Sequence, residues 1–166
     1  MVTERFFCRP CKTGTLVAGL LLVVTAMADS KPRLAEPYRK GFDRVWERAE
    51  AGKAPTMACA SVVGTAVGMA QRAGADATVR RDAVAAAHAC YVLAAAQYLE
   101  RYLATASGPA ACNGPIAAMA VHRSSLGGFI TDLGESRADY DQRIRALAGS
   151  RVRAACAHAA AVILGE

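Results

Sequence analysis

Apolar residues recur at helical spacing along most of the chain. The clearest example is segment 37–51, where charged side chains lie opposite four apolar positions, Phe42, Val45, Trp46 and Ala49. Positions i, i+3, i+4 and i+7 share one face of an α-helix. The pattern predicts an amphipathic helix that begins at Pro37, ends before Gly52 and places the only tryptophan in the core.

The same periodicity predicts four further helices, separated by breaks rich in Gly, Pro and Ser. Their expected ranges are 56–73, 78–106, 113–133 and 136–164. We expect Thr56, Thr78 and Ser136 to cap helix N-termini with their side-chain oxygens. Glycines predict a kink at Gly127–Gly128 and an interruption at Gly149–Ser150.

Two of these helices are expected to lie in the interior. Segment 56–73 carries almost no charge, and Gly64 and Gly68 allow another helix to approach closely. A Gly-x-x-x-Gly pair is also typical of membrane helices, but this apolar run is too short to span a bilayer, so core packing is favoured. The helix over 78–106 carries an aromatic stripe that is expected in the core: Tyr91, Tyr98 and Tyr102.

Composition favours helix over sheet. Alanine occupies 38 of the 166 positions, and aromatic residues make up only 6%. Alanine has the highest helix propensity, whereas aromatic residues favour strands. We therefore predict an all-α fold, an up-and-down bundle of four to five helices in a single domain over residues 29–166.

The first 28 residues are ordered like a secretory signal peptide. Basic residues precede an apolar run over 16–26, and Ala26-Met27-Ala28 provides the small residues of a cleavage site. The apolar run is shorter than the roughly 20 residues that span a bilayer. We expect cleavage after Ala28, and therefore a periplasmic or secreted protein with no stable membrane span. An uncleaved N-terminal anchor is the alternative.

Cleavage changes the charge of the working molecule. It removes three of the 20 basic residues and one of the 14 acidic ones, which lowers the formal net charge from +6 to +4. So small an excess, on an exported protein, gives no reason to expect a nucleic-acid partner.

Cleavage also leaves four of the six cysteines, and four cysteines in a small exported domain typically form two disulfides. At a rise of about 1.5 Å per residue in antiparallel helices, Cys59 and Cys90 reach similar heights, and so do Cys112 and Cys156. The other pairings are mismatched by about 10 Å or more, beyond the 7 Å limit for bonded Cα atoms. We therefore expect the bridges Cys59–Cys90 and Cys112–Cys156, which would compensate for a core that is rich in small alanines.

No segment carries the residue pattern of a metal, haem or catalytic site. His88 and His122 come to similar heights in the bundle, which leaves a two-histidine metal site as an alternative. The carboxylates near residue 134 suit helix-terminus electrostatics better than an acid and base pair. We expect neither a cofactor nor enzymatic activity.

These observations favour an exported protein that binds another protein in the bacterial envelope, as an inhibitor, an immunity-type factor or an accessory factor. The candidate partner surface is a group of arginines that could meet an acidic partner: Arg137, Arg143, Arg145, Arg151 and Arg153. A solvated helix face is the alternative explanation for this group. A second hypothesis is a small-ligand or metal carrier whose interior is lined by Tyr91, Tyr98, Tyr102, His88 and His122. A third is an envelope enzyme.

Overall fold

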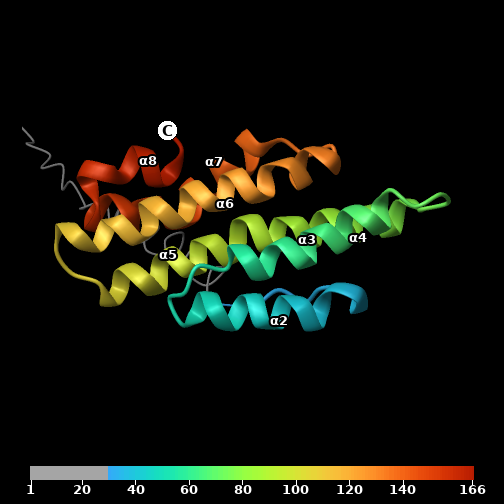
Figure 1. Cartoon of the computed structure of the whole chain (residues 1–166), viewed down its shortest axis with the longest axis horizontal. Helices are drawn as coiled ribbons and strands as arrows, with labels where there is room; N and C mark the ends of the chain where they lie inside the picture. Colours follow the sequence, from blue (N-terminus) through green and yellow to red (C-terminus); the bar gives the residue numbers. More distant parts are fainter. Residues whose placement is uncertain (1–29) are drawn as a thin grey trace, which may run out of the picture.

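The computed structural model describes residues 30–166, and every regular element in that range is helical (Figure 1). The predicted signal peptide, residues 1–28, lies outside the described residues. The predicted all-α class is confirmed. None of the described helices combines the length and the apolar character that crossing a bilayer requires. The elements in chain order are α2 (Glu36–Glu50), α3 (Thr56–Ala70), α4 (Ala77–His88), the π-helical η1 (Ala89–Leu93), α5 (Ala94–Thr105), the 3-10 turn η2 (Pro109–Cys112), α6 (Asn113–Asp132), α7 (Arg137–Ala155), the 3-10 turn η3 (Ala157–Ala159) and α8 (Ala160–Leu164).

Two of the three predicted N-caps are wrong. Ser136 caps α7 as predicted, since its side chain accepts from the N–H of Asp139 at 3.3 Å. α4 is capped by Asp76 rather than Thr78, because an aspartate is at least as good a cap and lies two residues earlier. Thr56 is the first residue of α3, and its hydroxyl contacts a histidine of α6 instead of capping its own helix.

The glycines that were expected to distort helices lie within continuous α-helix. α6 runs through Gly127–Gly128, and α7 runs through Gly149–Ser150. Gly149 is buried, and a Cβ there would lie 2.8 Å from Nη1 of Arg153, the end of a flexible side chain, and at the ordinary contact distance of 3.8 Å from Cδ1 of Leu164. The chain leaves the α-helix later, at Cys156, where φ is −133°.

The helix predicted over 78–106 changes its winding halfway. In η1, the N–H of Ala94 donates to the carbonyl of Ala89, five residues earlier, as in a π-helix. On one side of this turn α4 packs against α3, and on the other side α5 packs against α2 and α7. One long helix therefore contacts different neighbours along its two halves.

With α4, η1 and α5 taken as one long helix, successive helices alternate in direction, but several side-by-side pairs, α2 with α5 among them, are not consecutive in the chain (Figure 1). α6 lies along α3, and α7 lies along α5. Residue contacts advance in the same direction in both pairs, so each pair is parallel: Thr56 with His122 and Gly64 beside Phe129, then Tyr91 with Asp141 and Glu100 with Arg151. In the predicted up-and-down bundle each helix would pack mainly against the helices next to it in the chain, in antiparallel fashion. The observed bundle differs because it also contains these parallel pairs.

The core combines a few large side chains with many alanines. Trp46 is in the core as predicted, and its Nε1 donates to Glu50 at 2.9 Å. Tyr91 and Tyr98 are buried as predicted, and Tyr102 is half-buried. The long helix contributes fully buried alanines from both halves, among them Ala83, Ala86, Ala87, Ala94 and Ala95. Such small side chains allow helices to pack closely, at the cost of less buried apolar area per residue.

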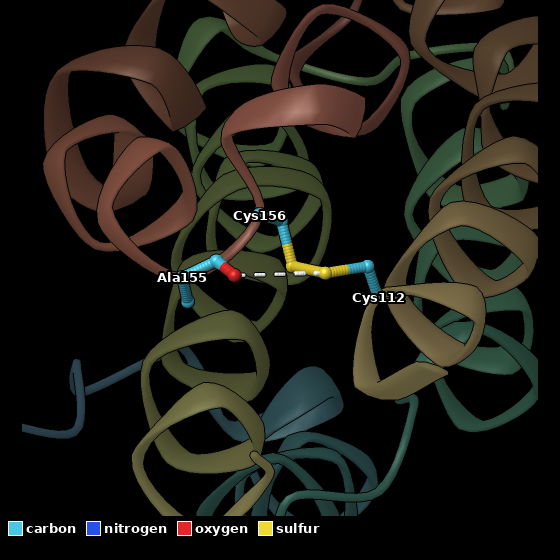
Figure 2. The surroundings of a disulfide bond; sticks show 3 residues. All are labelled: Cys112, Ala155 and Cys156. Atoms are coloured by element: carbon cyan, nitrogen blue, oxygen red, sulfur yellow. Dashed lines mark hydrogen bonds between the residues drawn. A yellow bond between two sulfur atoms is a disulfide. The ribbon is translucent and has the colours of Figure 1, made fainter. Parts of the chain in front are cut away.

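One of the two predicted disulfides is present. Cys112 and Cys156 are bonded, with their Cα atoms 5.8 Å apart (Figure 2). The sulfur of Cys112 also lies 3.7 Å from the carbonyl oxygen of Ala155. The bridge ties the start of α6 to the end of α7, just before the chain turns into η3.

The second predicted bridge is not formed in this structure. Cys59 and Cys90 are brought into contact, as their predicted heights require, but both are free thiols. In place of a sulfur–sulfur bond, the Cys59 thiol donates a hydrogen bond to the carbonyl of Cys90 at 3.4 Å.

Candidate functional site

Two carbonyl groups of η1 accept hydrogen bonds from the side chains of neighbouring helices. Cys59 of α3 donates to the carbonyl of Cys90, and His122 of α6 contacts the carbonyl of Tyr91 at 2.9 Å. A π-turn changes which N–H each carbonyl meets, and a buried carbonyl must find a partner elsewhere. We call this cluster the π junction; its members are Thr56, Cys59, Cys90, Tyr91 and His122.

The hydrogen bonds of His122 fix its tautomer. A carbonyl only accepts, so Nε2 must carry the proton that is donated to Tyr91. Nδ1 is then the acceptor for the hydroxyl of Thr56, at 3.2 Å. Burial lowers the pKa of His122 to about 4, so the ring is neutral near pH 7. Both ring nitrogens are occupied, and His122 connects three helices as a structural group.

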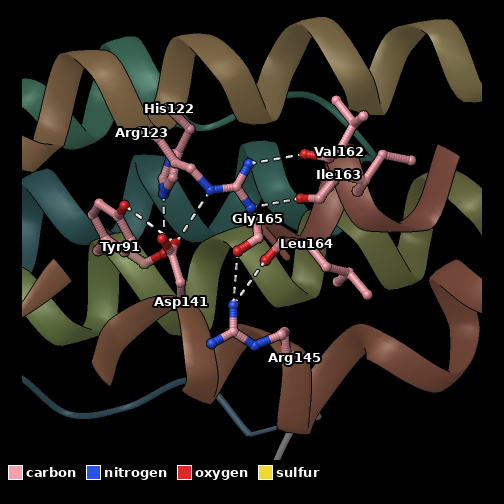
Figure 3. Close-up of polar contacts among 9 residues, drawn as sticks. All are labelled: Tyr91, His122, Arg123, Asp141, Arg145, Val162, Ile163, Leu164 and Gly165. Atoms are coloured by element: carbon pink, nitrogen blue, oxygen red, sulfur yellow. Dashed lines mark hydrogen bonds and ion pairs between the residues drawn. The ribbon is translucent and has the colours of Figure 1, made fainter. Parts of the chain in front are cut away.

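A second buried polar chain begins on the same tyrosine. The hydroxyl of Tyr91 donates to Oδ1 of Asp141 at 3.3 Å, and Nε of Arg123 donates to the same oxygen at 3.2 Å (Figure 3). Burial, followed by the nearby charge of Asp141, raises the pKa of Tyr91. The ion pair is largely shielded from solvent, with side-chain exposures of 14% for Arg123 and 11% for Asp141. This chain links η1, α6 and α7.

Two arginines hold the C-terminal turn of α8. Arg123 donates to the carbonyls of Val162 and Ile163, at 3.2 and 2.6 Å. Arg145 donates to the carbonyls of Leu164 and Gly165, at 3.3 and 3.0 Å (Figure 3). The last carbonyls of a helix have no N–H partner within it and carry partial negative charge. The two guanidinium groups therefore fasten α8 to α6 and α7.

The predicted arginine surface is largely engaged within the chain. Arg145 binds α8 as described, Arg151 pairs with Glu100, and Arg153 pairs with Glu166. Arg143 lies over the ring of Tyr140, with 5.6 Å from its guanidinium carbon to the ring centroid. Arg137 packs beside Gly127 of α6. The five arginines share helix α7 but do not converge on one point.

The residues predicted to line a ligand site are packed in the core. His88 and His122 do not approach each other, because the rings of Tyr140 and Tyr91 lie between them: centroid distances along the row are 5.7, 5.6 and 4.9 Å. Burial, and then the charge of Arg143, lowers the pKa of His88. Within residues 30–166, no group of three or more His, Cys, Asp or Glu side chains is placed to hold a metal ion.

One hollow of the described residues lies elsewhere. It measures about 710 Å³ and is lined by the segment 31–36 together with Arg39, Phe42 and Asp43 of α2. A smaller one, about 320 Å³, lies between the ends of α3 and α6, lined by residues such as Arg72, Arg80 and Asp132. Neither hollow is lined by the tyrosines and histidines that were predicted to bind a ligand.

The outer sides of the parallel helices α3 and α6 form an uncharged surface, which we call the neutral face. Its apolar exposed residues are Met57 and Val121, which are 78% and 50% exposed. Its other exposed residues are Ser61, Thr65 and Gly68 of α3 and Ala117, Ala120, Ser124, Ser125 and Gly128 of α6. Arg123, on α6, is turned toward α8.

The neutral face had a signal in the sequence. Residues 54–71 and 102–122 contain no Asp, Glu, Lys or Arg. For the first of these runs, the sequence favoured burial on most sides, and α3 does contact α2, α4 and α6. The remaining side of α3 is exposed, and it adjoins α6 because these two helices lie side by side.

A scan against protein-family models finds no match to this chain, and neither the curated proteins nor the solved structures yield a similar protein.

Proposed function

We propose that this chain is an exported helical protein that acts by binding another protein in the bacterial envelope, as an inhibitor, an immunity-type factor or an accessory factor. Residues 1–28 would direct export and be removed, leaving residues 29–166 in the periplasm or outside the cell. The bundle would then function in a compartment where disulfides persist, in line with the Cys112–Cys156 bridge. The proposal includes a second bridge, between Cys59 and Cys90.

The neutral face is the observation that carries the proposed binding function. Seven of the eight exposed residues of α2 are charged, and α7 exposes five charged residues, whereas Met57 and Val121 present apolar side chains among exposed residues that carry no charge. The cores of protein interfaces are depleted in charged residues, and also in serine and alanine, and are enriched in methionine, so the lack of charge and the exposed Met57 are the features that favour docking. We therefore assign the neutral face as the docking surface.

The chemistry of this face defines its partner. A charged segment placed on it would lose hydration without gaining a counter-ion. The exposed serine, alanine and glycine side chains are short, so a helix can approach closely. The expected occupant is an uncharged helical surface of another protein, with apolar side chains facing Met57 and Val121.

The arginines of α7 are the competing surface. Arg145, Arg151 and Arg153 already have partners within the chain, and a new acidic partner would have to displace them. Arg137 and Arg143 are exposed and are the members best placed to add electrostatic attraction at the edge of an interface. We give them this secondary role.

The interior of the bundle does not favour the carrier hypothesis. Tyr91, Tyr98 and His122 are each at most 3% exposed and are packed against neighbouring side chains. A ligand in the interior would have to displace these groups. Native mass spectrometry of the protein purified from its own cells would detect a bound ligand or metal and would thereby support the carrier hypothesis.

Photocrosslinking in the producing cells tests the docking surface. A photoreactive amino acid at position 57 or 121 should give one discrete adduct with the same partner, whereas position 154, exposed on α7, should not. Met57→Lys and Val121→Lys should abolish the adduct formed from the other position without lowering the melting temperature. Adducts only from α7 positions would overturn the assignment, and an adduct between two copies of this chain would replace the partner by self-association.

A further inference from the structure

Cys59 and Cys90 form a buried pair of thiols at the centre of the fold. Both side chains are 0% exposed, and the thiol of Cys59 is 3.4 Å from the carbonyl oxygen of Cys90. Cys59 belongs to α3 and Cys90 to η1, and the two cysteines are 31 residues apart in sequence. Their contact is therefore a product of the tertiary fold.

We propose that Cys59 and Cys90 form a second disulfide while the chain folds, and that the folded dithiol is protected from the same oxidation. The oxidant is a small or protein disulfide. The proposal rests on the proposed export only for the oxidising compartment in which the bond would form. The exchange reaction itself can be tested on purified protein.

The reaction is two consecutive thiol–disulfide exchanges. The Cys59 thiolate attacks a sulfur of the oxidant R–S–S–R, which forms a mixed disulfide and releases one thiol, R–SH. The Cys90 thiolate then attacks the Cys59 sulfur, which forms the Cys59–Cys90 bond and releases the second R–SH. The protein loses two electrons and two protons, and both are recovered in the two R–SH molecules.

Burial makes the reaction depend on the state of the fold. In the native state Cys59 and Cys90 are both fully buried, so an oxidant cannot reach either sulfur. Burial, together with the neighbouring Cys90 thiol, also raises the pKa of Cys59, which lowers the fraction of reactive thiolate. In the unfolded or partly folded chain neither obstacle exists, so exchange proceeds there.

The bond would also complete a regular pattern. Cys112–Cys156 closes a segment that contains α6, its turn and α7, with a separation of 44 residues. Cys59–Cys90 would close the segment of α3, its turn and α4, and the two closed segments do not overlap. Each bridge would then restrain one antiparallel helix pair.

The test compares two orders of folding and oxidation on residues 29–166 with Cys112→Ala and Cys156→Ala, so that only the pair of interest can react. In one arm, the unfolded chain refolds in a buffer of oxidised and reduced glutathione. In the other, it folds under reduction and then receives the same buffer. Free thiols are alkylated under denaturing conditions and counted by intact mass, and the linkage is mapped by peptide mass spectrometry.

The first arm should leave no alkylatable thiol and give the Cys59–Cys90 peptide pair. The second should retain two thiols, with an oxidation rate at least about tenfold slower that rises when mild denaturant opens the fold. Two free thiols in both arms would show that the Cys59–Cys90 bond does not form during folding. Equal oxidation rates in the two arms would show that the folded state does not protect the thiols. If the double variant does not fold, the same mapping on the wild-type chain decides, because a Cys59–Cys90 peptide supports the bond and free Cys59 and Cys90 refute it.

Discussion

Nε2 of His122 donates to the carbonyl oxygen of Tyr91 at 2.9 Å, across the boundary between α6 and the π-helical turn. The same ring accepts from Thr56 of α3, so one neutral imidazole satisfies polar groups from two other helices. Its protonation would remove the acceptor at Nδ1 and place a charge in the core.

Stability should therefore fall in mild acid because of His122. Burial lowers the pKa of this histidine in the folded state to about 4, against about 6.5 when unfolded. The unfolded chain takes up the proton first, so the contribution is intact above pH 6.5 and is lost as the pH falls toward 4. The loss should approach about 3 kcal/mol of unfolding free energy. Urea denaturation at a series of pH values measures it.

His122→Gln is the informative variant, because its neutral amide can still donate to Tyr91 and does not titrate. It should flatten the pH dependence between 6.5 and 4. His158→Gln, at an exposed position, should leave the dependence unchanged. An equally steep acid loss in His122→Gln would assign the effect to other groups.

Asp141→Asn should destabilise the fold by about 3 kcal/mol, because it leaves the guanidinium of Arg123 without its counter-ion in a shielded position. Tyr91→Phe removes only a neutral donor to the same oxygen and should cost about 1 kcal/mol. Equilibrium unfolding in urea compares the two. A cost for Asp141→Asn no larger than that for Tyr91→Phe would show that the ion pair adds little.

Paired glycine substitutions should have opposite effects. A Cβ at Gly41 would lie 2.9 Å from Cγ2 of Val62, so Gly41→Ala should push α2 away from α3 and cost about 1 to 3 kcal/mol. At Gly68 nothing lies within 4 Å, so Gly68→Ala should stabilise α3 by about 0.5 to 1 kcal/mol. Melting temperatures should thus shift in opposite directions, and a rise in both would contradict the close α2–α3 approach.

Removing the Cys112–Cys156 bridge by two alanine substitutions should lower the unfolding free energy by about 2 to 4 kcal/mol, since the bond restrains the unfolded chain. Calorimetry with and without reductant measures the effect in proteins that also carry Cys59→Ala and Cys90→Ala, so that no second bridge contributes. Reductant should lower the melting temperature of the protein that keeps Cys112–Cys156 and leave the protein without this bridge nearly unchanged.

The sequence predicted the helices better than their arrangement. The 3.6-residue period places α2 within a residue of its expected bounds, because the period reports which side of a helix is apolar. It does not report which helix covers that side, so the parallel contacts of α3 with α6 and of α5 with α7 were missed. The π-turn was missed as well, since its one extra residue per turn leaves no mark in the apolar pattern.

The buried polar groups were missed for a different reason. Asp141 lies in a highly charged stretch, and its carboxylate is buried because Tyr91 and Arg123 meet it from two other elements. The cysteine heights depended only on helix rise and turn positions, and they predicted which sulfurs would lie together. Whether each pair is bonded depends on chemistry that helix geometry does not contain.

The parallel pairing of α3 with α6 interleaves the two halves of the chain. Thr56 and His122 are 66 residues apart in sequence, and the helix from α4 to α5 separates their elements. A break in the backbone at the exposed turn Ser107–Gly108 would therefore give two fragments whose helices still pack against each other in one shared core. Two separately made fragments, 29–107 and 108–166, should each fold poorly alone and regain helical structure when mixed, as halves of one cooperative unit.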